Sequence, residues 1–182
     1  MAPDPRSSWS LFSADELRRM VRRMAFQIYE RHPDVGELVL VGIPTRGAAL
    51  AHRLARELEQ ITGAAPLVGV LDVRPYRDDR PPDAEPERDR SRLPGRLDGR
   101  HVVLVDDVLM TGRTIRAALD GLVRHGRPRT VRLAVLIDRG LREFPIQPDF
   151  VGRTLPTKAH ERVRVRLQEI DDQEGVWIVE HR

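Results

Sequence analysis

Two adjacent carboxylates follow a short apolar run and precede a loop of hydroxyl residues and glycine. The stretch 102–114 reads V-V-L-V-D-D-V-L-M-T-G-R-T, so Asp106 and Asp107 come where the apolar run ends. Carboxylates only accept hydrogen bonds, so this pair suits the two hydroxyls of a sugar. The threonines and glycine that follow are typical of a backbone cradle for phosphate at the start of a helix. A diol followed by a phosphate is the arrangement of a 5-phosphoribosyl group.

Three other interpretations of this stretch explain less. A Walker phosphate loop needs G-x-x-x-x-G-K-[ST], and the stretch has no lysine and a different glycine spacing. A receiver-type aspartate pocket also has adjacent acids, but it needs a partner lysine. The single lysine of the chain is Lys158, which is far from any matching strand pattern. A plain strand-to-helix turn explains Thr114 but not two carboxylates beside Thr111 and Gly112. The stretch therefore predicts a site for a phosphorylated sugar.

A second group suited to anions lies earlier in the chain. Thr45, Arg46 and Gly47 stand between an apolar run at 38–43 and a helical pattern. A helix N-terminus, a guanidinium and a glycine can converge on one anion there. The alternative is that Arg46 is an ordinary surface arginine.

The elements that must position these residues alternate between strand and helix. Apolar runs predict buried strands at 38–43, 67–73, 102–105 and 131–137. A capping box at 13–16 and helical periodicity predict helices at 13–32, 47–62 and 114–124. This alternation indicates the α/β class: an open, mainly parallel twisted sheet flanked by helices, with ligands at the carboxyl ends of its strands. Two further strands, at 163–167 and 175–179, predict a small C-terminal sheet.

The segment 74–99 breaks every pattern. It contains five prolines and many charges, so it is not expected to bury a core. A loop of this length inside a compact domain usually has a function. We expect a flexible cover over the active site, within a single domain that spans residues 1–182.

The composition excludes several classes of protein. The chain has no cysteine, so disulfides, thiolate chemistry and cysteine-bound zinc are excluded. No apolar run approaches the roughly 20 residues that cross a bilayer, and no signal pattern opens the chain, so a cytoplasmic protein without a membrane partner is expected. All but one of the 31 basic residues are arginines, which suit phosphate but also occur in proteins of GC-rich or heat-adapted sources. The net charge of +3 does not decide between phosphate binding and a compositional bias of the source.

The stretch 102–114 resembles the phosphoribosyl pyrophosphate signature of the type I phosphoribosyltransferases. Along nearly the whole chain, further landmarks are similar to those of the pyrimidine operon attenuation regulators, a family that also has uracil phosphoribosyltransferase activity. These landmarks are 41–47, 76–79, 126–128, 136–140 and 155–157. The resemblance implies the type I fold with a flexible lid loop and a small antiparallel C-terminal hood. It also implies a Mg²⁺-dependent conversion of uracil and phosphoribosyl pyrophosphate to uridine monophosphate (UMP) and pyrophosphate. Orotate, adenine and hypoxanthine transferases share the signature, so only the whole-chain resemblance selects uracil.

The resemblance implies roles for individual residues. Asp106 and Asp107 are expected to be catalytic and to bind Mg²⁺, partly through substrate or water, while Arg77 in the lid clamps the departing pyrophosphate. The residues expected to contact phosphoribosyl pyrophosphate or UMP are Thr45, Arg46, Gly47, Asp106, Asp107, Val108, Leu109, Met110, Thr111, Gly112, Arg113 and Thr114. The residues expected at the uracil edge are Ile137, Asp138 and Arg139. A surface ion pair between Asp138 and Arg139 fits the sequence equally well.

The same resemblance implies a second activity, which is binding of pyrimidine operon leader mRNA under the control of UMP and UTP. The arginines expected to contact RNA are Arg22, Arg23, Arg31 and Arg153. Phe26 and Pro44 depart from the polar or basic residues expected on this surface, and Gln147 is neutral where a basic residue is expected. A salvage transferase without an RNA-regulatory role therefore stays open as the alternative. A homodimer or homotetramer is expected in either case.

Overall fold

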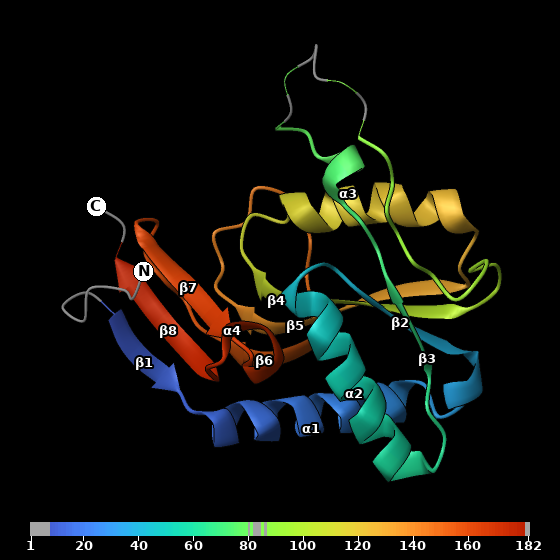
Figure 1. Ribbon diagram of the computed structural model, residues 1–182, viewed down its shortest axis with the longest axis horizontal. Coiled ribbons are helices and arrows are strands. Elements are labelled where there is room, and N and C mark those ends of the chain that lie inside the picture. The colour runs from blue at the N-terminus through green and yellow to red at the C-terminus, as the bar shows by residue number, and fades with distance from the viewer. Residues whose placement is uncertain (1–7, 80, 82–84, 86, 181–182) are drawn as a thin grey trace.

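A five-stranded parallel sheet forms the centre of the molecule. The computed structural model describes residues 8–79, 81, 85 and 87–180. The strands are β2 (Leu38–Gly42), β3 (Leu67–Val70), β4 (His101–Leu109), β5 (Thr130–Asp138) and β6 (Phe150–Thr154). Their order in the sheet is β3-β2-β4-β5-β6, and every neighbouring pair is parallel (Figure 1). The predicted α/β class and parallel sheet are confirmed.

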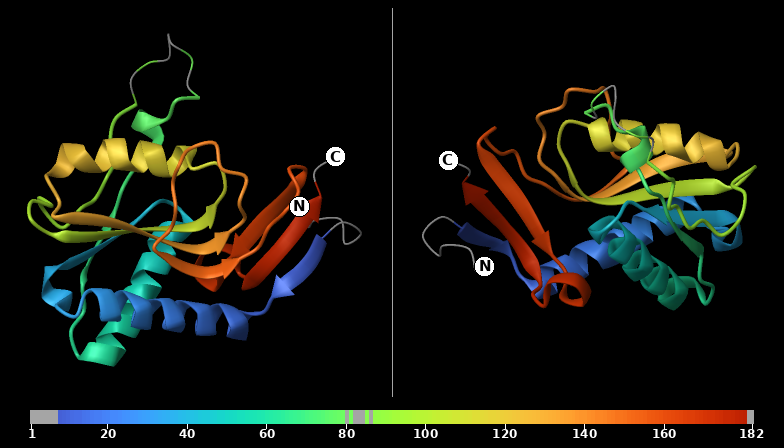
Figure 2. Two further views of the ribbon diagram at one scale, coloured as in Figure 1. Left: turned by 180° about the vertical axis from the view of Figure 1, so that it is seen from behind. Right: turned by 45° about the horizontal axis from the view of Figure 1, so that its top comes forward.

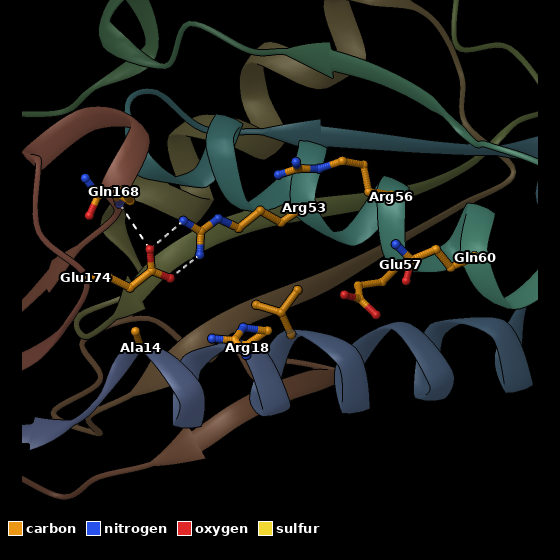
Figure 3. A pocket seen from close by; sticks show the side chains of 9 residues that line it. Ala14, Arg18, Arg53, Arg56, Glu57, Gln60, Gln168 and Glu174 are labelled. Atoms are coloured by element: carbon orange, nitrogen blue, oxygen red, sulfur yellow. Dashed lines mark hydrogen bonds and ion pairs between the residues drawn. The ribbon is translucent and has the colours of Figure 1, made fainter.

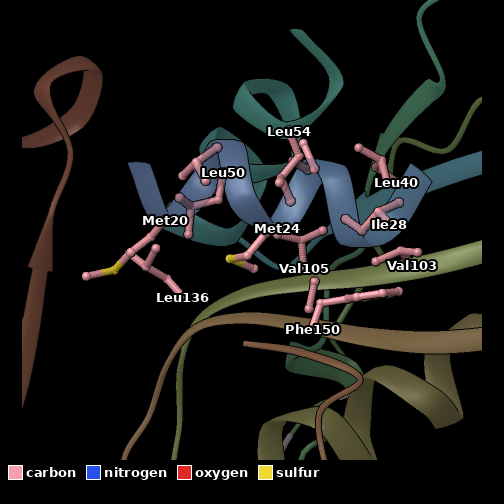
Figure 4. Close-up of a cluster of buried hydrophobic side chains, with 14 of the residues drawn as sticks. Met20, Met24, Ile28, Leu40, Leu50, Leu54, Val103, Val105, Leu136 and Phe150 are labelled. Atoms are coloured by element: carbon pink, nitrogen blue, oxygen red, sulfur yellow. The ribbon is translucent and has the colours of Figure 1, made fainter. Parts of the chain in front are cut away.

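Helices cover both faces of this sheet. The helices α1 (Ala14–Arg31) and α2 (Arg46–Thr62) lie on one face, and α3 (Arg113–Leu122) lies on the other (Figure 1). Because successive strand residues point to opposite faces, Val103 and Val105 pack with Met24 of α1 (Figure 4), whereas Val102 and Leu104 pack in the cluster under α3. The two layers of core hold the strand ends, and thus the loops that follow them, in fixed positions.

The first helix begins where the sequence predicted. The Ser13 backbone N–H donates to the Glu16 carboxylate over 2.8 Å, and the Glu16 N–H donates back to the Ser13 hydroxyl over 3.4 Å, which completes the capping box. Further along α1, the Arg23 guanidinium donates to the main-chain carbonyls of Val151 and Gly152. These carbonyls belong to β6, the edge strand of the sheet, so Arg23 joins α1 to that edge.

A second, antiparallel sheet forms a hood beside the main sheet. Its strands are β1 (Ser8–Phe12), β7 (Glu161–Arg166) and β8 (Gly175–Glu180), in the order β1-β8-β7 (Figure 2). The short helix α4 (Gln168–Asp171) connects β7 to β8. The small C-terminal sheet was predicted, but its third strand comes from the N-terminal part of the chain.

The remaining differences from the sequence-based expectations are strand β6, which was not predicted, the bounds of some elements and one segment. Strand β4 continues through Asp106 and Asp107 to Leu109, and β3 ends at Val70. Three short 3-10 helices lie at Val35–Glu37, Arg74–Tyr76 and Val123–His125. The expectation that 74–99 buries no core is wrong at Leu97, which is 1% exposed and packs in the cluster under α3. The expected flexibility of this segment falls partly on residues 80, 82–84 and 86, which lie outside the described residues.

Candidate active site

Two tightly packed glycines place the second predicted anion loop beside the end of β4. A Cβ atom on Gly47 would lie 2.4 Å from the Val105 carbonyl oxygen, and one on Gly42 would lie 2.4 Å from the Ala48 Cα. Only glycine fits such contacts with backbone atoms. The loop between β2 and α2, which includes a cis peptide bond between Pro44 and Thr45, therefore runs against β4. The start of α2 thus lies next to the predicted carboxylates.

A cavity of about 320 Å³ opens at this point. Arg46 at the start of α2 and Asp107 of β4 line one side of it. The other lining residues belong to β7 and α4 of the hood and are Val163, Arg164, Val165, Arg166 and Asp171. Asp106 is not among the lining residues, because adjacent residues of a strand point to opposite faces. The structure therefore brings Arg46 and Asp107 together, whereas Asp106 is buried outside this cavity, at 8% exposure.

Both carboxylates are electrostatically unusual. Burial raises the pKa of Asp106 well above its ordinary value, and the neighbouring Asp107 charge adds to this. Burial also raises the pKa of Asp107, although the Asp106 side chain and the Arg46 guanidinium oppose the rise. Each carboxylate accepts the next backbone N–H over 2.9 Å. A partner that supplies positive charge or hydroxyl donors would therefore stabilise their ionised forms.

The predicted phosphate cradle forms the start of α3. Gly112 precedes the helix at φ 89°, a left-handed conformation that favours glycine. In the described part of the chain, the residue before α3 makes no side-chain capping hydrogen bond. The first N–H groups of the helix are therefore not satisfied by a cap. Among them, the Arg113 N–H has only a long contact of 3.3 Å with the Thr111 hydroxyl. Such an end of a helix is a ready site for a phosphate.

The predicted base-binding residues lie at the end of β5. Asp138 and Arg139 do not form the surface ion pair that the sequence allowed, because they are 9% and 4% exposed and bind different partners. Burial raises the pKa of Asp138, but hydrogen bonds from Arg142 and the Gly140 N–H hold it below its ordinary value overall. Ile137 is fully buried within the strand.

Two arginines fix the segment after β5. Arg139 donates to the Thr157 hydroxyl over 2.8 Å and to the Glu161 carbonyl over 2.6 Å, so it anchors the chain that leads into the hood. Arg142 donates to Asp138 and to the carbonyl of Met110 in the phosphate loop, over 2.7 and 3.0 Å. Sequence reasoning missed Arg142, and no local pattern marked it.

Arg77 lies outside the cavity. Its guanidinium pairs with Asp79, with Nε 2.9 Å from Oδ1. The neighbouring Tyr76 is fixed on α3, since its ring fills the space over Gly121 and its carbonyl accepts from Arg116. The role of Arg77 at pyrophosphate stays a prediction, and it requires the chain beyond Tyr76 to move.

The four arginines predicted to bind RNA lie on α1 and on β6. Arg22 and Arg23 are exposed on α1, but Arg23 is bonded to β6. Arg153 lies with its guanidinium carbon 5.6 Å from the centre of the Phe12 ring. Arg31 is eight residues beyond Arg23, about 12 Å further along the helix axis. Of the four, Arg22 and Arg31 are the exposed arginines whose side chains have no hydrogen-bond or ion-pair partner in the described part of the chain.

A further cavity, of about 420 Å³, opens between α1 and α2 (Figure 3). It contains none of the predicted site residues. Its lining residues are Ala14, Arg18, Val21, Arg53, Arg56, Glu57, Gln60, Gln168 and Glu174. Arg53 reaches across to Glu174, so this cavity touches the turn that carries α4.

The architecture is shared with known enzymes. A hypoxanthine phosphoribosyltransferase from Trypanosoma cruzi matches the structure with a TM-score of 0.74, at 20% identity over 95% of this chain and 94% of that one. A hypoxanthine phosphoribosyltransferase from Staphylococcus aureus matches with a TM-score of 0.73, at 16% identity over 99% and 97%. At these identities the likeness establishes the fold, which is that of the type I phosphoribosyltransferases.

Sequence comparison defines the family more closely. The family model described as "Phosphoribosyl transferase domain" matches residues 10–169. The protein called "Bifunctional protein PyrR" is 50% identical in Nostoc punctiforme, over 93% of this chain and 95% of that protein. The protein of the same name in Latilactobacillus sakei is 47% identical, over 89% and 92%. The chain belongs to the phosphoribosyltransferase family and, within it, to the PyrR proteins.

None of the helices in the described ranges is both long and apolar enough to span a membrane.

Proposed function

We propose that this protein transfers the phosphoribosyl group of phosphoribosyl pyrophosphate to uracil, and that it also binds the leader mRNA of a pyrimidine operon. One observation carries the first part: Asp107 of β4 and Arg46, which follows β2, line one cavity at the carboxyl ends of these adjacent strands, and β4 leads directly into the uncapped start of α3. The start of α3 supplies N–H donors for the 5-phosphate, Asp107 an acceptor for the ribose hydroxyls and Arg46 a cation for the pyrophosphate.

The chemistry then depends on charge. As the bond from the anomeric carbon to pyrophosphate weakens, positive charge develops on the ribose ring and negative charge on the leaving group. The ionised Asp107 faces the first of these charges and Arg46 the second, so both stabilise the transition state more than the ground state. No covalent nucleophile is required. The segment 74–99 would cover the reacting groups, and the anchored Tyr76 would serve as one of its hinges.

The site fits Mg²⁺ as a cofactor. Its donors are carboxylate oxygens, which Mg²⁺ prefers, and no group of three or more acidic or histidine side chains able to hold a metal exists among the described residues. Mg²⁺ would therefore be held by Asp106 or Asp107 only in part, directly or through water, and otherwise by substrate oxygens. When bound, it would neutralise charge on the departing pyrophosphate.

A panel of bases tests the transferase proposal. Purified protein with phosphoribosyl pyrophosphate and Mg²⁺ is expected to convert uracil to UMP, with little turnover of hypoxanthine, adenine or orotate. Product is measured by chromatography, and samples with EDTA or without phosphoribosyl pyrophosphate serve as controls. Turnover of hypoxanthine or adenine with none of uracil would refute the assignment of the base, and no turnover of any base would refute the transferase itself.

The RNA proposal rests on the exposed face of α1. Arg22 and Arg23 lie on this face, and Phe26, one helical turn beyond Arg22, is 45% exposed. Arginines bind phosphate, while an exposed aromatic ring can stack on an unpaired base, which is how single-stranded RNA is recognised. The relatives at 45–50% identity carry the name "bifunctional", and RNA binding is the second activity that we assign to this chain.

A hairpin from the pyrimidine operon leader tests this activity. The protein is expected to bind it more tightly than a scrambled hairpin, and more tightly with UMP. Arg22→Ala is expected to weaken binding and to reduce the slope of log affinity against log salt by about one, because one phosphate contact is lost. Arg96→Ala is the matched control, since Arg96 is an exposed arginine whose one ion pair among the described residues is with Asp98. Equal binding of both hairpins, unaffected by UMP, would leave a salvage enzyme alone.

A further inference from the structure

The pyrophosphate-loop arginine is held by the hood. Nε of Arg46 donates to Oδ2 of Asp171 over 3.1 Å, and Nη2 donates to Oδ1 over 2.5 Å. The same carboxylate accepts the backbone N–H of Leu167 over 2.9 Å, so its own position is set by the start of α4. The two side chains are 34% and 16% exposed. A planar, two-bond pair in partial burial fixes the orientation of a guanidinium more firmly than a surface contact would.

The rest of the Arg46 guanidinium is left for a ligand. A guanidinium has five N–H groups, and Asp171 takes two of them. The other three have no hydrogen-bond partner within the part of the chain that the structure describes. Arg46 and Asp107 line one cavity, and the charges of Asp171 and Asp107 both raise the pKa of Arg46. Asp171 thus holds one edge of the guanidinium and leaves the opposite edge free.

The attachment of the hood does not depend on this pair alone. Two turns further along α2, Arg53 binds Glu169 over 2.9 Å and also binds Glu174 (Figure 3). The Arg53 side chain is only 15% exposed. A second link therefore joins α4 and its turn to α2 away from the cavity, so loss of the Asp171 carboxylate should leave the hood in place.

We propose that Asp171 is a positioning residue of the transferase, which orients Arg46 so that its free edge faces the pyrophosphate of the substrate. This inference rests on the proposed function. It extends the pyrophosphate site beyond the loop at 45–47 to a residue of the hood. It also gives α4 a role in substrate affinity.

Binding measurements on the whole protein test the inference. Asp171→Asn keeps the size of the side chain but removes its charge. Calorimetric titration with inorganic pyrophosphate and Mg²⁺ is expected to show about tenfold weaker binding, as for the loss of one charge-assisted hydrogen bond. UMP, which has no pyrophosphate, should bind as before. In kinetics, KM for phosphoribosyl pyrophosphate should rise more than kcat falls. Asp171→Glu, which keeps the charge, should restore part of the affinity.

Glu169→Gln is the matched control, because it removes a carboxylate from the same short helix at the link to Arg53. This variant should change neither the affinity for pyrophosphate nor the affinity for UMP. Unchanged pyrophosphate affinity in Asp171→Asn would overturn the inference. Equal loss of pyrophosphate and UMP binding would also overturn it, since that pattern indicates a displaced hood. If the unaltered protein bound UMP but not pyrophosphate with Mg²⁺, the transferase proposal would fail, and the inference with it.

Discussion

Replacing Asp107 by Asn is expected to slow UMP formation by about 100-fold, the usual effect of removing one group that stabilises a transition state by its charge. The carboxylate lines the cavity beside Arg46, and the proposed mechanism places it against the ribose ring that becomes positive. Asparagine has the same shape but no charge, and it replaces an acceptor-only group by one that also donates. The measurement is kcat with uracil and saturating phosphoribosyl pyrophosphate.

The same substitution should not destabilise the fold. Burial raises the pKa of Asp107, so the folded protein holds the proton more tightly than the unfolded chain does. The stability that this group contributes is therefore greatest below its unfolded pKa, and it is lost as the pH rises through its folded pKa. At neutral pH the neutral Asn should unfold at the same temperature or a higher one.

Asp15→Asn provides the comparison for Asp107→Asn. Asp15 lies at the exposed start of α1, with a side chain 67% exposed, and its ion pair with Arg18 is far from the strand ends. Its loss should leave kcat unchanged. If Asp107→Asn turned over uracil as fast as the unaltered protein while remaining folded, the assigned role of this carboxylate would be wrong.

Gly47→Ala is expected to destabilise the protein by about 3 kcal/mol, because the added methyl would enter a space filled by backbone. The new Cβ would lie 2.4 Å from the Val105 carbonyl oxygen and 3.1 Å from the Asp106 Cα. Neither atom belongs to a side chain that can rotate away. The start of α2 would have to move off β4, and Arg46 would move away from Asp107. Urea unfolding gives the free energy, and pyrophosphate binding reports on the site.

Gly36→Ala separates this effect from the general cost of removing a glycine. A Cβ atom at Gly36 would lie 3.2 Å from the Asp34 carboxylate, an exposed side chain that can shift. Its free energy of unfolding should change little. If both variants unfolded at the same urea concentration, the close approach of α2 to β4 would not be a source of stability.

Most of the main sheet could be predicted from the sequence because its strands are buried on both faces. Runs such as 38–42 and 131–137 are almost continuously apolar. Such runs are typical of strands that are covered on both faces, because side chains on both sides then need to be apolar. The extension of β4 was missed because Asp106 and Asp107 are polar residues within a strand. Strand β6 was missed because it is a short edge strand that mixes buried and exposed residues.

The local parts of the site were also predictable, whereas its long-range contacts were not. The stretch 106–114 carries its own pattern of acids, hydroxyls and glycine. No such local pattern surrounds Asp171, because its proposed role depends on Arg46, which is 125 residues away in the chain. The partners of Arg139 and Arg142 likewise become visible only when the end of β5, the phosphate loop and the hood are seen together.

The hood sheet combines strands that are far apart in the sequence, and this affects when the sheet can form during synthesis of the protein. Strand β1 is made long before its partner β8, because the pairing places Trp9 opposite Ile178. At translation rates of roughly 5–20 residues per second, β1 waits on the order of ten seconds for this partner. The parallel sheet can assemble on the ribosome during that time, and the hood closes last. A nascent chain can therefore place Asp171 against Arg46, the arrangement that we propose for pyrophosphate, only after the 125 residues that separate them have been made.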